Sequence, residues 1–328
     1  MSILNHERKI LIESNLLVRK YKVKKISVII PFYDGNKHLK RMKKVLDYNY
    51  EFVCGMAELE VLYINDSPWI EIETKLLETN RYTIKVINHS QNGGIHQARV
   101  TGINNASGEY IMMLDQDDVI AKDCLVTLFN KIEETHCDCV IGNGVFQTPT
   151  GDKIILNNYG KTILAKDYRS YLAMGNLLSS PGQTLIKKNA INPFWMEHIM
   201  KTNCADDLFL WCLLMKRKNI AYCNKLVYLH INTGENFSLD KMNGLKSDNE
   251  VLRFLRLNRS ISPLFLNLFE MRYKYQMKVN GESSEKRMVM FYPIILNAWK
   301  SYGMLLSGVN RLIGNKVPTY MDKSIFDY

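Results

Sequence analysis

The chain has 328 residues, of which 46% are hydrophobic and 23% are charged. This composition is typical of a folded protein with a sizeable core and excludes a disordered chain. The seven cysteines are odd in number and irregularly spaced, which excludes a disulfide framework and predicts a reducing, cytoplasmic environment. The first nine residues lack the apolar stretch of a secretory signal. The longest apolar run near the C-terminus, residues 288–296, falls short of the roughly 20 residues that a membrane span needs.

The formal net charge of +10 is unevenly distributed along the chain. Residues 1–25 hold seven basic against two acidic residues, and residues 239–328 hold fourteen against eight. We therefore expect a basic N-terminal extension (1–25), a nearly neutral body (26–238) and a basic helical C-terminal region (239–328). Such ends could rest on an anionic membrane surface or simply keep the protein soluble, and the sequence leaves both open.

Segments rich in β-branched residues alternate with segments of helical spacing through the first half of the chain. This alternation predicts an α/β fold with a mostly parallel sheet, whose ligands bind at the carboxyl ends of the strands. Residues 145–200 show no clear pattern. Strands are predicted at 25–30, 59–64, 82–87, 110–114, 138–141 and 225–230, and helices at 39–46, 95–106, 125–132, 206–214 and beyond 238.

Three carboxylates follow the strand at 110–114 directly, from Asp115, Asp117 and Asp118. Carboxylates this close raise one another's pKa unless a cation lies among them. Their oxygen ligands suit Mg²⁺ or Mn²⁺, which would in turn hold a diphosphate. The alternative is an Asp-rich turn with no ligand.

Other polar groups also lie at predicted strand ends or helix starts. Asp206 and Asp207 precede a buried helix, where they could act as a general base or only as helix caps. The segments concerned are Pro31-Phe32-Tyr33-Asp34, Asn65-Asp66-Ser67, Asn92-Gly93-Gly94 with Arg99, and Asp206-Asp207.

The order and spacing of these groups resemble family 2 glycosyltransferases of the GT-A fold over roughly residues 25–240. The resemblance implies a Rossmann-like, mostly parallel sheet flanked by helices, here with a C-terminal helical extension. It implies inverting transfer of a sugar from a UDP-sugar to a hydroxyl of a glycan or lipid-linked acceptor, in surface-polysaccharide synthesis. It also implies Mn²⁺ or Mg²⁺ as cofactor, which would neutralise the UDP leaving group. Surface-polysaccharide synthesis fits a cytoplasmic body whose basic ends could rest at the inner face of the membrane.

The resemblance also implies roles for individual residues. Asp207 would be the catalytic base beside Asp206, and Asp66 would accept a hydrogen bond from the N3–H of uracil. Asn65 and Pro68 depart from the family's usual turn, so the base preference stays open. Gln183 would face the acceptor, and Asp118 would support the metal site. The metal ligands would be Asp117, Asp115 and His230, and the nucleotide-sugar contacts Pro31, Tyr33, Asp34, Asp66, Gly93, Gly94, Arg99, Asp115 and Gln116.

Other classes of protein fit the sequence less well. A sugar-phosphate nucleotidyltransferase needs a Gly-rich basic loop after the first strand, where only Gly35 stands. A nucleic-acid-binding protein would concentrate its positive charge, which here is split between the two ends. A relative that only holds a glycan would not need the Asp pairs. The sugar, the acceptor, the linkage and the oligomeric state are not determined by the sequence.

Overall fold

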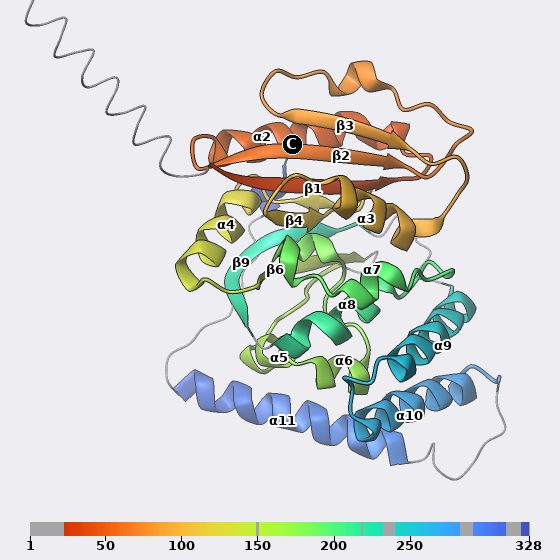
Figure 1. The fold of residues 1–328 in the computed structure, drawn as a ribbon. Coiled ribbons are helices and arrows are strands. Elements are labelled where there is room, and N and C mark those ends of the chain that lie inside the picture. The colour runs from red at the N-terminus through yellow and green to blue at the C-terminus, as the bar shows by residue number, and fades with distance from the viewer. Residues whose placement is uncertain are drawn as a thin grey trace, which may run out of the picture.

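A computed structural model describes residues 23–148, 151–217, 219–231, 240–282, 291–312 and 323–327. Most of the expected basic N-terminal extension, residues 1–22, lies outside these ranges. The described chain is built around one nine-stranded sheet with the order β3-β2-β1-β4-β8-β6-β9-β5, and β7 pairs with β6 (Figure 1).

The N-terminal half of the sheet is parallel. Its strands form where the sequence predicted them, because runs of β-branched residues fit a sheet that is buried on both faces. All the strand pairs β3-β2, β2-β1 and β1-β4 run in the same direction, so their carboxyl ends meet at one edge. The strands are β1 (Lys24–Phe32), β2 (Ala57–Asn65), β3 (Thr83–Asn88) and β4 (Tyr110–Met113).

The second half of the sheet is mixed. Strand β8 joins β4 to β6 by antiparallel pairing, and β6 then pairs with β9 in parallel. The short β5 pairs with the end of β9, which brings the chain after Asp118 beside His230. The sequence did not predict β5, β7 or β8. These strands are β5 (Val119–Ile120), β6 (Cys139–Thr148), β7 (Gly151–Ile154), β8 (Thr184–Lys187) and β9 (Ile220–His230).

Helices cover both faces of the sheet. Alternate residues of β1 point to opposite faces, so Val28 packs with the core under α2 (Leu39–Val53) and α4 (Cys124–Thr135). Ile29 packs on the other face, under α3 (Gly94–Asn105) and α8 (Asp206–Leu214).

Glycine at position 102 lets α3 lie unusually close to β1. A Cβ atom on Gly102 would lie 2.2 Å from Cγ2 of Ile29, which no real side chain tolerates. This close packing matters for the site, because Arg99 stands one turn earlier on the same helix.

The remaining helices lie beyond the second half of the sheet. In Figure 1, α10 and α11 run below α5 and α6, far from β1 to β3. The described residues beyond 240 are largely helical, as predicted, while the division into three parts stays a prediction. Among the described helices, none is long and apolar enough to cross a membrane. The helices are α5 (Tyr159–Leu164), α6 (Tyr168–Met174), α7 (Pro193–Glu197), α9 (Lys241–Leu257), α10 (Pro263–Val279) and α11 (Tyr292–Leu312), with 3₁₀ turns at Asn36–His38, Thr74–Leu77, Pro181–Gln183, Lys188–Ala190, Met215–Arg217 and Lys323–Phe326.

A buried carboxylate braces the amino ends of the central strands. Glu60 of β2 is 1% exposed and accepts hydrogen bonds from Ser27 Oγ at 2.6 Å, Lys85 Nζ at 2.9 Å and the Ser107 amide at 2.5 Å. Burial alone would raise the pKa of Glu60, but these bonds lower the pKa from 4.5 to about 2. The ionised form is therefore the stabilising one.

We predict that Glu60→Gln lowers the free energy of unfolding by about 1–3 kcal/mol at pH 7, because it leaves buried donors poorly paired. Since the folded pKa of Glu60 lies below its unfolded value, its contribution is complete above pH 4.5 and fades as pH falls toward 2. Urea denaturation of both proteins between pH 7 and pH 3 measures this. A stability gap that does not narrow at low pH would contradict the assignment.

Candidate active site

The predicted polar residues gather at the carboxyl edge of the parallel strands. Arg99 is buried there between two carboxylates contributed by distant parts of the chain. Its Nη1 donates to Asp206 Oδ2 at 2.6 Å, and its Nη2 donates to Asp115 Oδ1 at 2.6 Å. Burial would lower the pKa of Arg99, but these carboxylates hold it above its ordinary value. The Asp pair of the β4 turn and the Asp pair of α8 are thereby joined into one site.

The carboxylate next to this bridge has the properties of a general base. Asp207 is 9% exposed and begins α8, where its Oδ2 accepts from Asn176 Nδ2 at 2.8 Å and its Oδ1 from the Leu208 amide at 2.7 Å. Burial and the charge of Asp206 raise the pKa of Asp207 to about 7. A base with this pKa can accept a proton near neutral pH.

The turn after β4 presents a second group of acids. Asp118 is fully buried and accepts hydrogen bonds from the Tyr228 hydroxyl, from His230 Nδ1 and from the Ile231 amide at 3.0 Å. Burial would lower the pKa of His230, but its bond to Asp118 raises it overall. Asp118 therefore orients His230 and closes the end of β9 against the turn.

Asp117 is the acid of this turn whose charge is opposed by both of its acidic neighbours. Burial, followed by the charges of Asp118 and Asp115, raises the pKa of Asp117 to about 6. Its main-chain carbonyl accepts from Arg41 Nη2 at 2.7 Å, which anchors the turn to α2. A cation beside Asp117 would relieve the repulsion among the three carboxylates.

The side chains present suit a metal that arrives with a diphosphate better than a bare ion. Within the described ranges, no group of three or more His, Cys, Asp or Glu side chains could hold a metal ion by itself. Asp115 is engaged by Arg99 and by Ser180 Oγ, which donates at 2.8 Å. Asp117 and His230 Nε2 are the groups there that could add one oxygen and one nitrogen ligand, and Mg²⁺ commonly takes only one or two side chains together with substrate phosphates.

Asp66 organises the Gly93-Gly94 turn. Its carboxylate is 4% exposed and accepts from His89 Nδ1 at 2.8 Å, Asn92 Nδ2 at 3.0 Å, and the Gly93 and Gly94 amides at 2.7 and 2.8 Å. Gly94 has a φ of +83°, which a side chain would disfavour. Because a carboxylate has about four acceptor positions, a uracil N3–H would have to share an oxygen already in use. The uracil contact of Asp66 stays a prediction.

Gln116 fastens the β4 turn to the end of β1. Its Oε1 accepts from the Tyr33 amide at 3.0 Å, and its Nε2 donates to the Tyr33 carbonyl at 2.7 Å. Next in the chain, Asp34 has a φ of +46° and donates its amide to Ser67 Oγ at 2.9 Å. The Tyr33 ring is 45% exposed and meets the edge of Trp69, which is 62% exposed, at 5.9 Å between ring centres. These rings form an open aromatic corner over the strand ends.

The structure adds residues that the sequence did not single out. Asn176 and Ser180 donate to the predicted carboxylates of Asp207 and Asp115, and Arg41 donates to the Asp117 main chain, but each comes from a segment without a motif. Trp69 had one usable signal, since it follows the Asp66 turn directly. Gln183, which was expected to face the acceptor, is fully buried and its Oε1 accepts from the Ser179 amide at 2.7 Å; its acceptor role stays a prediction.

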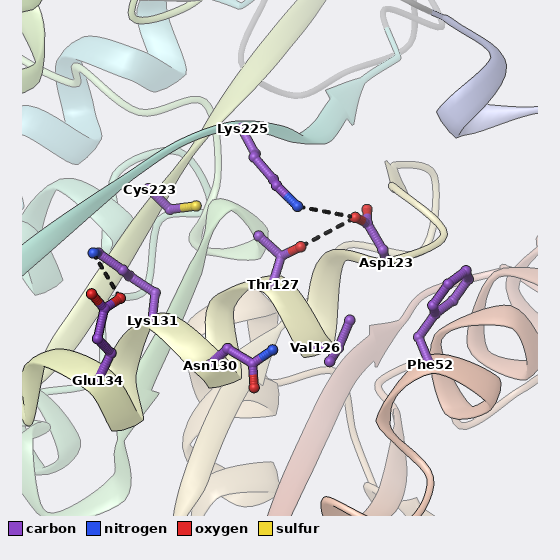
Figure 2. Close-up of a pocket in the computed structure, with 9 residues that line it drawn as sticks. All are labelled: Phe52, Asp123, Val126, Thr127, Asn130, Lys131, Glu134, Cys223 and Lys225. Carbon is purple, nitrogen blue, oxygen red and sulfur yellow. Dashed lines mark hydrogen bonds and ion pairs between the residues drawn. The ribbon is translucent and has the colours of Figure 1, made fainter. Parts of the chain in front are cut away.

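A pocket of about 290 Å³ lies elsewhere, between α4, the end of α2 and β9 (Figure 2). None of the predicted site residues lines it. Its charged residues pair with one another, Lys225 with Asp123 at 3.6 Å and Lys131 with Glu134 at 3.0 Å. The pocket therefore offers no converging polar groups for a ligand.

Comparison with solved structures defines the class of the fold. Residues 1–349 of S. aureus TarS, crystallised in complex with UDP-GlcNAc, match with a TM-score of 0.57 at 14% identity, over 91% of this chain and 94% of that one. The expected GT-A fold is confirmed by this match and by the sheet described above.

Sequence comparison identifies the family. Glycosyl transferase family 2 matches residues 27–191, so the chain belongs to this family. Glycosyltransferase GlyG of Streptococcus pneumoniae is 29% identical over 36% of this chain and 38% of its own length. The Escherichia coli UDP-Glc:alpha-D-GlcNAc-diphosphoundecaprenol beta-1,3-glucosyltransferase WfgD is 25% identical over 61% of this chain and 73% of its own length. The match thus spans well under half of GlyG.

We predict that Arg99→Met lowers the free energy of unfolding by about 3–5 kcal/mol, because it leaves Asp206 buried without its cation. Arg81→Met is the matched control, since Arg81 pairs with Glu51 at 3.0 Å with both side chains about half exposed. That change should cost less than about 1 kcal/mol. Urea denaturation measures both, and similar small losses would show that the Arg99 bridge does not support the fold.

Proposed function

We propose that this protein is an inverting, metal-dependent glycosyltransferase that moves a sugar from a UDP-sugar to a hydroxyl of a glycan or lipid-linked acceptor in surface-polysaccharide synthesis. The observation that carries the proposal is the Arg99 bridge, which joins Asp115 to Asp206 beside the raised-pKa carboxylate of Asp207. Arg99 thus holds Asp115, which is proposed to contact the donor, next to Asp207, which is proposed as the base. Such an arrangement suits group transfer. The relatives support it: TarS was crystallised with UDP-GlcNAc, and the name of WfgD specifies a UDP-sugar and a lipid-linked acceptor.

The donor would lie across the strand ends. The uracil would stack in the corner of Tyr33 and Trp69, where each aromatic contact to a base is worth about 1–3 kcal/mol. Arg99 and the turn glycines would face the diphosphate and sugar. The proposed contacts are Pro31, Tyr33, Asp34, Asp66, Gly93, Gly94, Arg99, Asp115 and Gln116.

Asp117 and His230 would hold Mn²⁺ or Mg²⁺ together with the diphosphate, and Asp115 would complete the site through ribose or a metal-bound water. The metal would supply Lewis-acid neutralisation of the departing UDP. Asp118 would keep His230 oriented for this task, because it bonds Nδ1 and so leaves Nε2 as the nitrogen for a metal.

Asp207 would remove the proton from the acceptor hydroxyl. The acceptor oxygen then forms its bond to the anomeric carbon while the bond from that carbon to the UDP oxygen breaks on the opposite face, so the configuration inverts. Asp206 would help to keep the pKa of the base near neutral, since its charge helps to raise the pKa of Asp207. We place this reaction in the cytoplasm, at an anionic membrane surface where a lipid-linked acceptor would be presented.

The metal role can be tested with a panel of nucleotide sugars. With Mn²⁺ we expect UDP release from one UDP-sugar, loss of release in EDTA, and a fall in kcat of about 10²–10⁴-fold for Asp117→Asn, equivalent to several kcal/mol. Asp123→Asn, an acid outside the site, is the matched control and should keep full activity. Donor binding is read separately from quenching of the exposed Trp69. If no nucleotide sugar binds with metal present, the proposal fails.

The base assignment predicts a pH dependence. Because Asp207 acts when deprotonated, kcat should rise with pH through about 7 and level off above it. Asp207→Asn should lower kcat by about 10²–10⁴-fold without loss of donor binding. Asn176→Ala removes a hydrogen bond that lowers the pKa of Asp207, so the rising limb should move to higher pH. A pH profile that Asn176→Ala leaves unchanged counts against Asp207 as the base.

A further inference from the structure

Helix α11 carries an apolar stripe on its outer face. Ile294 is 64% exposed, Leu305 66% and Val309 51%, with Met304 and Tyr302 exposed on either side. Ile294, Leu305 and Val309 lie eleven and then four positions apart, a spacing that keeps them on one side of a helix. Large side chains exposed together in this way mark an interaction surface.

The stripe cannot fold back onto the body, because the opposite face of α11 is already anchored there. A Cβ on Gly160 of α5 would lie 1.7 Å from the Gly303 carbonyl, so the two helices touch through their backbones. Trp299 Nε1 donates to Ser170 Oγ at 3.1 Å, and the Tyr292 hydroxyl donates to the Ala173 carbonyl at 2.9 Å. The outer stripe therefore points away from α5 and α6, as the position of α11 in Figure 1 also indicates.

The charged residues of α11 itself are basic. The helix has no acidic residue, and Lys300 is exposed one turn before Met304. The acids within α9 and α10 are engaged in ion pairs: Asp248 with Arg272 at 3.2 Å, Glu250 with Arg253 at 3.3 Å, and Glu270 with Arg256 at 2.6 Å. Glu270 also pairs with Lys274 at 3.3 Å, and the further lysines of α9 and α10 are Lys241, Lys246 and Lys278.

We propose that α11 lies in the plane of an anionic lipid surface, with Ile294, Leu305 and Val309 inserted at the headgroup boundary. An apolar stripe edged by lysine and tyrosine fits that boundary, where acyl chains meet anionic headgroups. A second copy of the chain fits less well, because pairing through this stripe would bring two positively charged helical layers together. Only the biological role of this surface rests on the proposed function: it would hold the enzyme where a lipid-linked acceptor lies.

Sedimentation with vesicles tests the surface. We expect the full chain to bind phosphatidylcholine vesicles containing 30% phosphatidylglycerol, and to bind pure phosphatidylcholine or high-salt samples at least tenfold more weakly. The double variant Ile294→Glu/Leu305→Glu should lose binding at least tenfold. The matched control is Phe52→Glu/Met56→Glu, which changes two exposed apolar residues at the end of α2 and should bind as the wild type does. Circular dichroism checks that both variants fold.

Three results would overturn the proposal: no binding to anionic vesicles, equal loss in the control, or light scattering that shows a wild-type dimer broken by the α11 variant without vesicle binding. The last would assign the stripe to a second copy. UDP release is measured in parallel without lipid and should be the same in both variants. Vesicle binding that persists in a protein without nucleotide-sugar turnover would support the membrane surface while the proposed function fails.

Discussion

The site depends on one buried cation. Arg99 lies inside the protein with ion pairs to Asp115 and Asp206, and burying either carboxylate without it would carry a large desolvation penalty. Three separate segments must therefore dock at once: the β4 turn, α3 and the start of α8. The close approach of α3 to β1 at Gly102 sets the position of the guanidinium, so a feature of core packing determines the geometry of a polar site.

Much of the polar chemistry at the strand ends serves to hold loops in place. Asp66 binds the amides at the start of α3, and Asp118 binds three groups around β9. These internal bonds fix the loops before any ligand arrives, which reduces the entropy lost on binding. Asp117 is different, since its pKa is raised to about 6 by burial and neighbouring acids. A nearby cation would therefore stabilise the ionised form of Asp117 more than that of the other two.

The sequence predicted the parallel half of the sheet well, because each of its strands contains a short, largely apolar run that needs no distant partner to be recognised. Strands β5, β7 and β8 are two to four residues long and exist only through pairing with β6, β9 or β4, so no local pattern marks them. The sequence predicted which residues gather at the site, but it did not predict which side chains contact one another there. No sequence pattern marked the two ion pairs of Arg99, and Asn176 and Ser180 come from the stretch that showed no pattern.

The reciprocal pairing of the Gln116 amide with the Tyr33 main chain has a dynamic consequence. The Tyr33 amide proton is held by a side chain 83 positions away and not by a neighbouring strand. It can exchange with solvent only when the acidic turn separates from the end of β1. The exchange rate of that one proton would therefore report how often the acidic turn and the end of β1 separate, and slowing on addition of a ligand would give the free energy by which the ligand holds them together.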